Sequence, residues 1–200
     1  MILQCNFLYD LETTTKMQPK PPTTTSCPTK LTPIQGYIST LHRCHRGPEK
    51  CFDGNIASMC RSQNEATPWL AFEFQAQINV ASVIIYNPPQ YGNRTSNVEL
   101  RVTDKLPPTI GRTMFREEGH LIGHFAGPGK DGEIIKIETD SSRSGRYLLI
   151  QMDKRGLPSG SHRKLNLTEV EVIGIYEQGK KNSLSDLTDK SSQVSQVLLE

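Results

Sequence analysis

Apolar and polar side chains alternate most regularly near the end of the chain. Over residues 165–175, Val170 and Val172 are separated by Glu171, and a period of two predicts a strand with one buried face and one wet face. Residues 147–150 form a short, continuously apolar run, which is typical of a strand in a sandwich core. About a dozen turn-forming residues join the two runs, which predicts neighbouring antiparallel strands.

Similar short runs occur upstream, separated by Pro and Gly clusters, and none has a convincing helical period. We therefore predict an all-β fold of the sandwich type. The expected strands cover residues 69–74, 81–86, 97–103, 121–125 and 134–137. The residues expected in or beside the core are Trp69, Phe72, Phe74, Val83, Ile85, Leu100, Val102, Leu148, Ile150, Val170 and Val172.

Composition changes at both ends of the chain. The chain has 200 residues, with 35% hydrophobic residues, enough for one domain with tails. Residues 1–34 include a Thr/Pro-rich stretch that cannot bury a core; it is interpreted equally as an O-glycosylated stalk or as a disordered tail. We expect the domain to span residues 35–176 and a disordered polar tail to span residues 177–200.

The charge and the apolar runs restrict the class of partner. A formal net charge of +2 gives no argument for nucleic acid or an anionic membrane surface. No run has the length of a transmembrane helix. The first residues do not form an intact signal peptide, so we expect a piece of a longer secreted protein or a misplaced start.

All five cysteines lie in the first third of the chain. The odd number leaves at least one unpaired within the chain, and Cys44, Cys51 and Cys60 are close enough for a local disulfide. His42 and His45 beside Cys44 make only a weak zinc pattern, so a disulfide or a free thiol is the favoured interpretation.

Other motifs carry little chemistry. The glycosylation sequons at Asn93 and Asn166 support an extracellular location only weakly. His120 and His124 fall in a predicted strand, where side chains four residues apart do not meet, and no catalytic constellation stands out. We expect the protein not to be an enzyme.

Several segments together resemble one known family. They are Cys51-Phe52-Asp53-Gly54-Asn55, Cys60, Pro68-Trp69-Leu70-Ala71-Phe72-Glu73-Phe74, Val83-Ile84-Ile85-Tyr86-Asn87, Ser96-Asn97-Val98-Glu99-Leu100-Arg101-Val102, Gly145-Arg146-Tyr147 and Leu165-Asn166-Leu167-Thr168-Glu169-Val170-Glu171-Val172. Their order and spacing resemble those of F-type lectins (fucolectins), a branch of the discoidin-like, coagulation-factor-C-type domains. The resemblance implies a jelly-roll β-sandwich of the galactose-binding-domain type, a structural Ca²⁺ ion and a fucose site. It also implies a secreted, extracellular lectin with glycans or glycoproteins as partners, and it leaves a cell-surface protein open as a further partner.

The resemblance places a calcium site in the loop at Asp53. Calcium takes six to eight hard oxygen ligands, and the family joins a carboxylate of this loop to the Glu of its last strand. The alternative is an ordinary Asp-Gly-Asn turn. The implied calcium residues are Asp53, Asn55, Ser58, Thr168 and Glu169, with the backbone oxygens of Lys50 and Thr168 as further ligands.

The family's sugar-binding residues are mostly replaced. Its His falls on Ser62, its Arg-x-Asp falls on Pro88 and Gln90, and its second Arg falls near Arg94. Loss of these polar contacts, worth about 1 kcal/mol each, predicts that fucose is not bound in the family's way. Tyr91 is placed to stack on another sugar, although an exposed loop tyrosine is an equal interpretation.

The candidate ligand residues are therefore Ser62, Gln90, Tyr91 and Arg94. The alternative function is a discoidin-type adhesion or protein-interaction module without sugar binding. Thr168 replaces the family's partner of Cys60, so Cys60 pairs with Cys44 or Cys51 or stays free.

Overall fold

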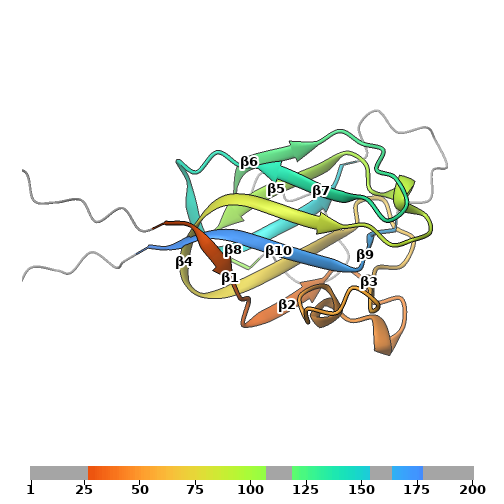
Figure 1. The fold of residues 1–200 in the computed structure, drawn as a ribbon. Coiled ribbons are helices and arrows are strands. Elements are labelled where there is room, and N and C mark those ends of the chain that lie inside the picture. The colour runs from red at the N-terminus through yellow and green to blue at the C-terminus, as the bar shows by residue number, and fades with distance from the viewer. Residues whose placement is uncertain (1–26, 107–118, 154–163, 178–200) are drawn as a thin grey trace, which may run out of the picture.

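The computed structural model describes residues 27–106, 119–153 and 164–177, which form an antiparallel β-sandwich (Figure 1). The strands are β1 Thr29–Leu31, β2 Gln35–Ile38, β3 Cys60–Arg61, β4 Trp69–Tyr86, β5 Val98–Thr103, β6 His120–Phe125, β7 Ile134–Glu138, β8 Ser144–Met152, β9 Asn166–Leu167 and β10 Glu169–Tyr176. Three short 3₁₀ turns complete the described part: η1 Cys44–Arg46, η2 Pro48–Cys51 and η3 Gly92–Arg94.

Strand β4 belongs to both layers of the sandwich. Its first part pairs with β2 and β8, and its second part pairs with β10 and β7. The register with β8 shifts between Glu73 and Ile78, where Gln75 and Gln77 interrupt the apolar pattern. Such an irregularity bends a strand, so the two strands predicted over 69–74 and 81–86 are one continuous strand.

The two runs that the sequence predicted to be neighbours are not paired with each other. β8 and β10 each pair with β4, and β8 also pairs with β5. The prediction of adjacent antiparallel strands was therefore wrong. Local turn signals indicate where strands end, but pairing is decided by which apolar faces meet in the sandwich.

The predicted core is confirmed. Every residue expected there is buried, and all but Trp69 belong to one cluster between the layers. Trp69 packs with Ala71 and Leu149 in a second cluster. Because Trp69 alternates with Leu70 along β4, its side chain lies on the opposite face of the same strand.

The described fold starts earlier than the predicted boundary at residue 35. Strand β1 pairs with the end of β10, with Thr29 opposite Gly174, and Lys30 forms an ion pair with Glu171. Most of the predicted stalk and tail, residues 1–26 and 178–200, lies outside the described residues. Among the described residues, no helix is long and apolar enough to cross a membrane.

Candidate functional site

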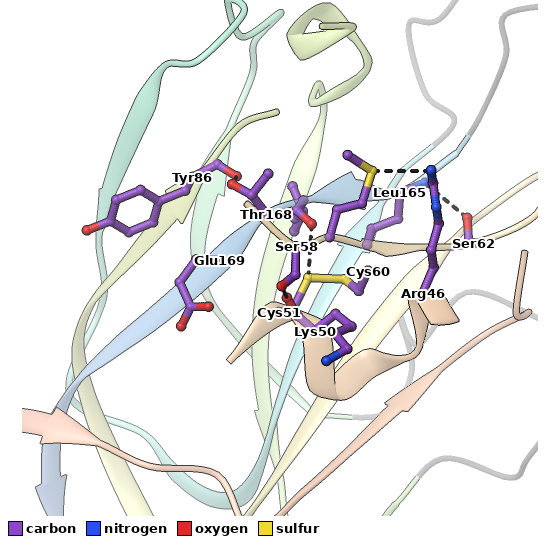
Figure 2. The surroundings of a disulfide bond; sticks show 12 residues. Arg46, Lys50, Cys51, Ser58, Cys60, Ser62, Tyr86, Leu165, Thr168 and Glu169 are labelled. Carbon is purple, nitrogen blue, oxygen red and sulfur yellow. Dashed lines mark hydrogen bonds between the residues drawn. A yellow bond between two sulfur atoms is a disulfide. The ribbon is translucent and has the colours of Figure 1, made fainter. Parts of the chain in front are cut away.

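A buried disulfide anchors the loop that precedes β4. Cys51 at the end of η2 is bonded to Cys60 of β3, and both are fully buried (Figure 2). This is one of the pairings left open by the sequence. Cys44 and Cys27 are exposed free thiols. The disulfide closes the segment 51–60, which contains the predicted calcium residues of this loop.

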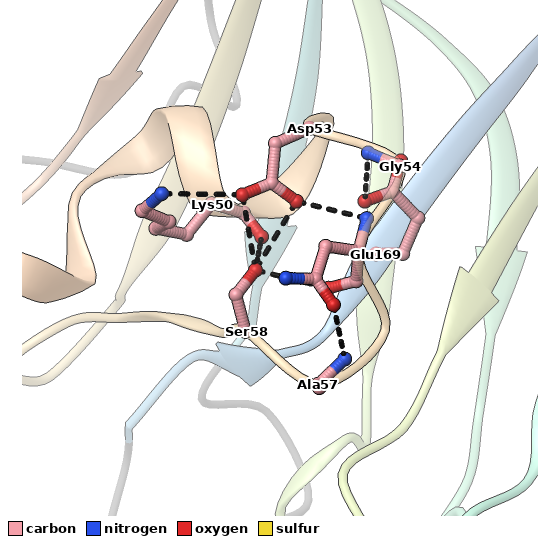
Figure 3. Close-up of polar contacts among 7 residues, drawn as sticks. Lys50, Asp53, Gly54, Ala57, Ser58 and Glu169 are labelled. Carbon is pink, nitrogen blue, oxygen red and sulfur yellow. Dashed lines mark hydrogen bonds and ion pairs between the residues drawn. The ribbon is translucent and has the colours of Figure 1, made fainter.

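Oxygen atoms crowd around the hydroxyl of Ser58 inside that segment (Figure 3). Ser58 Oγ lies 3.1 Å from each carboxylate oxygen of Asp53, 2.9 Å from the carbonyl of Asn55 and 3.3 Å from the carbonyl of Lys50. A serine hydroxyl has one hydrogen to donate, so it satisfies only one of these acceptors. The loop thus gathers more acceptor oxygens than the hydroxyl can serve.

Glu169 brings a second carboxylate from the first position of β10. Its Oε2 accepts a hydrogen bond of 3.1 Å from the backbone N–H of Gly54, next to Asp53. Glu169 is only 3% exposed. Burial raises the pKa of its carboxyl, the Gly54 N–H partly offsets this, and the charge of Asp53 raises it further.

Asp53 behaves in the opposite way. Burial opposes its ionisation, but donors from the Asn55 backbone, Lys50 and Ser58 together hold its pKa below the ordinary value. The Lys50 ammonium lies 3.3 Å from Asp53 Oδ2. A cation of the protein itself therefore stands beside the oxygen cluster.

The side chains of the remaining predicted calcium residues, Asn55 and Thr168, form hydrogen bonds within the protein. The side-chain oxygen of Asn55 accepts from the N–H of Ala57, which leaves its carbonyl in the cluster. The hydroxyl of Thr168 donates to the Tyr86 carbonyl, so this hydroxyl is already engaged within the protein. In the described part of the chain no three His, Cys, Asp or Glu side chains form a metal-binding group; this loop has two carboxylates, and its other oxygens are hydroxyl and carbonyl.

Ser62 does not lie on a ligand-binding surface, and its assignment as a candidate ligand residue is corrected. Its side chain is fully buried. Its hydroxyl donates to the Gln63 carbonyl and accepts from the N–H of Leu165. Ser62 therefore joins the loop after β3 to the segment before β9, and a ligand could reach it only if this contact opened.

The loop after β4 presents an aromatic ring. Tyr91 is 54% exposed and has a left-handed backbone at φ 68°, which is uncommon for a residue with a side chain. The guanidinium carbon of Arg94 lies 4.1 Å from the ring centroid, a cation–π contact. Gln90 is exposed beside it, whereas Pro88 is buried.

The sequence argument missed Arg61 as a candidate ligand residue. Arg61, at the end of β3, has a buried Nε without a hydrogen-bond partner, and His42 Nδ1 and Arg94 Nη1 are in the same condition. The backbone N–H of His42 donates to the Arg61 carbonyl at 3.1 Å. The available signal was the family's His position. The resemblance places that position on Ser62, which directly follows Arg61 in the sequence.

The two glycosylation sequons differ in access. Asn166 is 3% exposed and lies in β9 opposite Arg61, so a glycan could not be attached to it in this fold. Asn93, in η3, is exposed. His120 and His124 are exposed on β6, and His124 Nε2 lies 3.3 Å from the side-chain oxygen of Asn97.

Comparison with solved structures identifies the fold. The chain is similar to the F-type lectin from striped bass (Morone saxatilis) serum, with a TM-score of 0.54 and 21% identity over 76% of this chain, and it spans 50% of that lectin. It is also similar to the lectin domain of lectinolysin complexed with Lewis B antigen, with a TM-score of 0.51 and 20% identity over 72% of this chain and 93% of that one.

A third similar structure is the CBM32 domain of AlyQ in complex with 4,5-unsaturated mannuronic acid, with a TM-score of 0.52 and 14% identity over 72% of this chain and 97% of that one. No protein-family model and no curated protein sequence matches the chain. The fold is therefore the β-sandwich of F-type lectins and CBM32 modules, as the sequence resemblance predicted.

Proposed function

We propose that this chain contains an extracellular carbohydrate-recognition domain whose binding loops are organised by a structural calcium ion. The observation that carries the proposal is the exposed ring of Tyr91, placed under Arg94 at an end of a lectin-type sandwich. An aromatic side chain combines a flat apolar face with a polar tip. That combination suits the C–H face and the hydroxyls of a sugar ring.

The known ligands of similar proteins support sugar binding in general. Lewis B antigen and 4,5-unsaturated mannuronic acid occupy two of the similar structures. The domains in these comparisons are mostly binding modules, although one belongs to a chain with an alginate lyase domain. We propose binding without catalysis, and not in the fucose-binding manner of F-type lectins, because Pro88 and Gln90 supply neither a guanidinium nor a carboxylate.

The calcium site is supported by the arrangement around Ser58. Calcium favours carboxylate and carbonyl oxygens, and the loop directs both kinds toward one point. Asp53 and Glu169 would hold the ion with the Ser58 hydroxyl and the carbonyls of Asn55, Lys50 and Thr168. The ion would neutralise two neighbouring carboxylates and fix the 51–60 loop to β10.

The extracellular location is supported by the buried disulfide, since disulfides persist in oxidising compartments. Glycans or glycoproteins, including those of a cell surface, are the proposed partners.

A glycan array tests the proposal. The calcium-loaded full chain should bind a defined subset of glycans, and Tyr91→Ala should remove that binding while leaving thermal stability unchanged. Leu121→Ala, which removes another exposed apolar side chain from β6, is the matched control and should bind as the wild type does. If a calcium-loaded, folded chain binds no glycan but binds a protein, the domain is an interaction module on the same scaffold.

A further inference from the structure

Four cationic or ionisable residues from separate segments lie around Arg61, and we call them the arginine cluster: His42, Arg46, Arg61 and Arg94. The backbone of His42 is bonded to that of Arg61. Arg46 Nη1 lies 3.2 Å from the sulfur of Met59, two residues before Arg61. The charges of Arg94, Arg46 and Tyr91 all act on Arg61. Strand β3, η1 and the loop after β4 therefore lie near one another at Arg61.

Several other cations that the structure describes are balanced by a carboxylate. Lys30, Lys50, Arg101, Lys136 and Arg146 each form an ion pair. Within residues 27–106, 119–153 and 164–177, no ion pair involves Arg46, Arg61 or Arg94. The only side-chain acceptor described for Arg46 is the thioether of Met59, a weak one.

Three nitrogens of the cluster are buried without a partner in the protein. They are His42 Nδ1, Arg61 Nε and Arg94 Nη1. Buried polar groups in folded proteins are nearly always hydrogen-bonded, and an unmatched one costs about 1–3 kcal/mol. Asn166, opposite Arg61, is buried but neutral, so it does not balance the charge.

The pKa values of two members of the cluster are lowered in the fold. Burial lowers the pKa of Arg61, and the charges of Arg94 and Arg46 lower it further. Burial also lowers the pKa of His42, together with the charges of Arg61, Arg43, Lys164 and Arg46. Both groups therefore experience an excess of positive charge that an anion would relieve.

We propose that the arginine cluster and Tyr91 bind an acidic saccharide, with the carboxylate or sulfate of the sugar on Arg61 and Arg94 and a sugar ring on Tyr91. The inference rests on the proposed carbohydrate-binding function and names the class of sugar. A guanidinium matches the planar oxygens of a carboxylate or sulfate with paired N–H donors. Arg94 lies over Tyr91, so the charged contact and the stacking surface are adjacent.

Calorimetric titration of the calcium-loaded full chain tests this proposal with matched probes. The first pair is trigalacturonate and its methyl ester, and the second pair is 3-sulfogalactose and galactose. At least one charged probe should bind at least about tenfold more tightly than its neutral partner, and the difference should shrink as salt rises, since screening weakens exposed charge interactions. The charged probe that binds more tightly shows whether the site prefers a carboxylate or a sulfate.

Substitutions place the site on the cluster. Arg61→Met and Arg94→Met keep an unbranched apolar stem. Each should weaken binding of the charged probe by at least about tenfold, since charge-assisted hydrogen bonds are stronger than neutral ones. Lys136→Met removes the same charge from β7 and should change nothing. A cooperative thermal unfolding transition in each variant confirms that it is folded.

Two results would overturn the inference in distinguishable ways. Equal binding of charged and neutral probes contradicts the acidic class but leaves carbohydrate binding intact, whereas binding of no saccharide at all contradicts both. Inorganic sulfate that binds as tightly as sulfogalactose shows a simple anion site and also contradicts the proposal.

Discussion

Glu169 Oε2 accepts a hydrogen bond from the backbone N–H of Gly54, 115 residues away in the chain. This contact joins the start of β10 to the disulfide-closed loop. It places a buried carboxylate beside Asp53, where each negative charge disfavours the other. A calcium ion would turn that repulsion into a shared attraction.

The first prediction concerns these two carboxylates. Asp53→Asn or Glu169→Gln should weaken calcium binding by at least about tenfold, or 1.4 kcal/mol, because each removes a charged ligand and keeps the shape. Calorimetric calcium titration measures this. Glu171→Gln is the matched control on the same strand, where Glu171 pairs with Lys30, and it should bind calcium as the wild type does. Unchanged affinity in the first two variants would contradict the site.

The second prediction concerns pH in the presence of chelator. The pKa of Glu169 is raised above its ordinary value of 4.5 in the fold, so the folded state binds this proton more tightly than the unfolded state does. Its contribution therefore stabilises the calcium-free fold at low pH and is lost as pH rises from 4.5 through the raised pKa.

Denaturant unfolding at several pH values checks the sign. The free energy of unfolding of the wild type, relative to Glu169→Gln, should fall with rising pH in this window. The pKa of Asp53 is lowered from 3.8, so its opposite effect lies at more acidic pH. A difference that rises with pH would contradict the burial argument.

Lys50 should compete with calcium for Asp53. Its ammonium lies 3.3 Å from Asp53 Oδ2, and both side chains are partly exposed, so the pair is worth less than about 1 kcal/mol. Lys50→Met should strengthen calcium binding by about threefold, because the ion would no longer displace the ammonium and the carbonyl of Lys50 remains. Weaker calcium binding in this variant would show that Lys50 supports the site.

The disulfide should stabilise the fold and the calcium loop together. Cys51 and Cys60 are nine residues apart, and closing a loop of this size contributes about 2–3 kcal/mol in the chain-entropy model. The double substitution to Ala should therefore lower the free energy of unfolding by at least this amount and weaken calcium binding. Cys44→Ala, which removes an exposed free thiol, should change neither property.

Sequence patterns predicted the sandwich and its core because alternation reports directly which face of a strand is buried. The sandwich and its core could be predicted from Val170, Val172 and the apolar runs on either side of residue 75. Strand pairing was harder to predict from the sequence. Strands β8 and β10 both pair with the long β4, and the turn-forming residues between them do not show that they share a neighbour.

The two candidate sites differed in how far the sequence could describe them. The family resemblance named Asp53, Ser58 and Glu169 as one set, and the structure brings Glu169 to Gly54, next to Asp53. Ser62 was misassigned because consecutive residues at the end of β3 differ in surroundings: Arg61 has a partner-free Nε, whereas Ser62, just after the strand, is fully buried. The convergence of Arg61, His42 and Arg94 depends on tertiary contacts that no local pattern encodes.

Thermal unfolding of one chelator-stripped sample, measured before and after adding calcium and then L-fucose, tests the central claim most directly. The account predicts a rise in melting temperature with calcium, because a ligand that binds only the folded state stabilises it. It predicts no further rise with millimolar fucose, because Pro88 and Gln90 replace the donors and carboxylate of the fucose site. A melting temperature indifferent to calcium and chelator, or one raised by fucose, would contradict it.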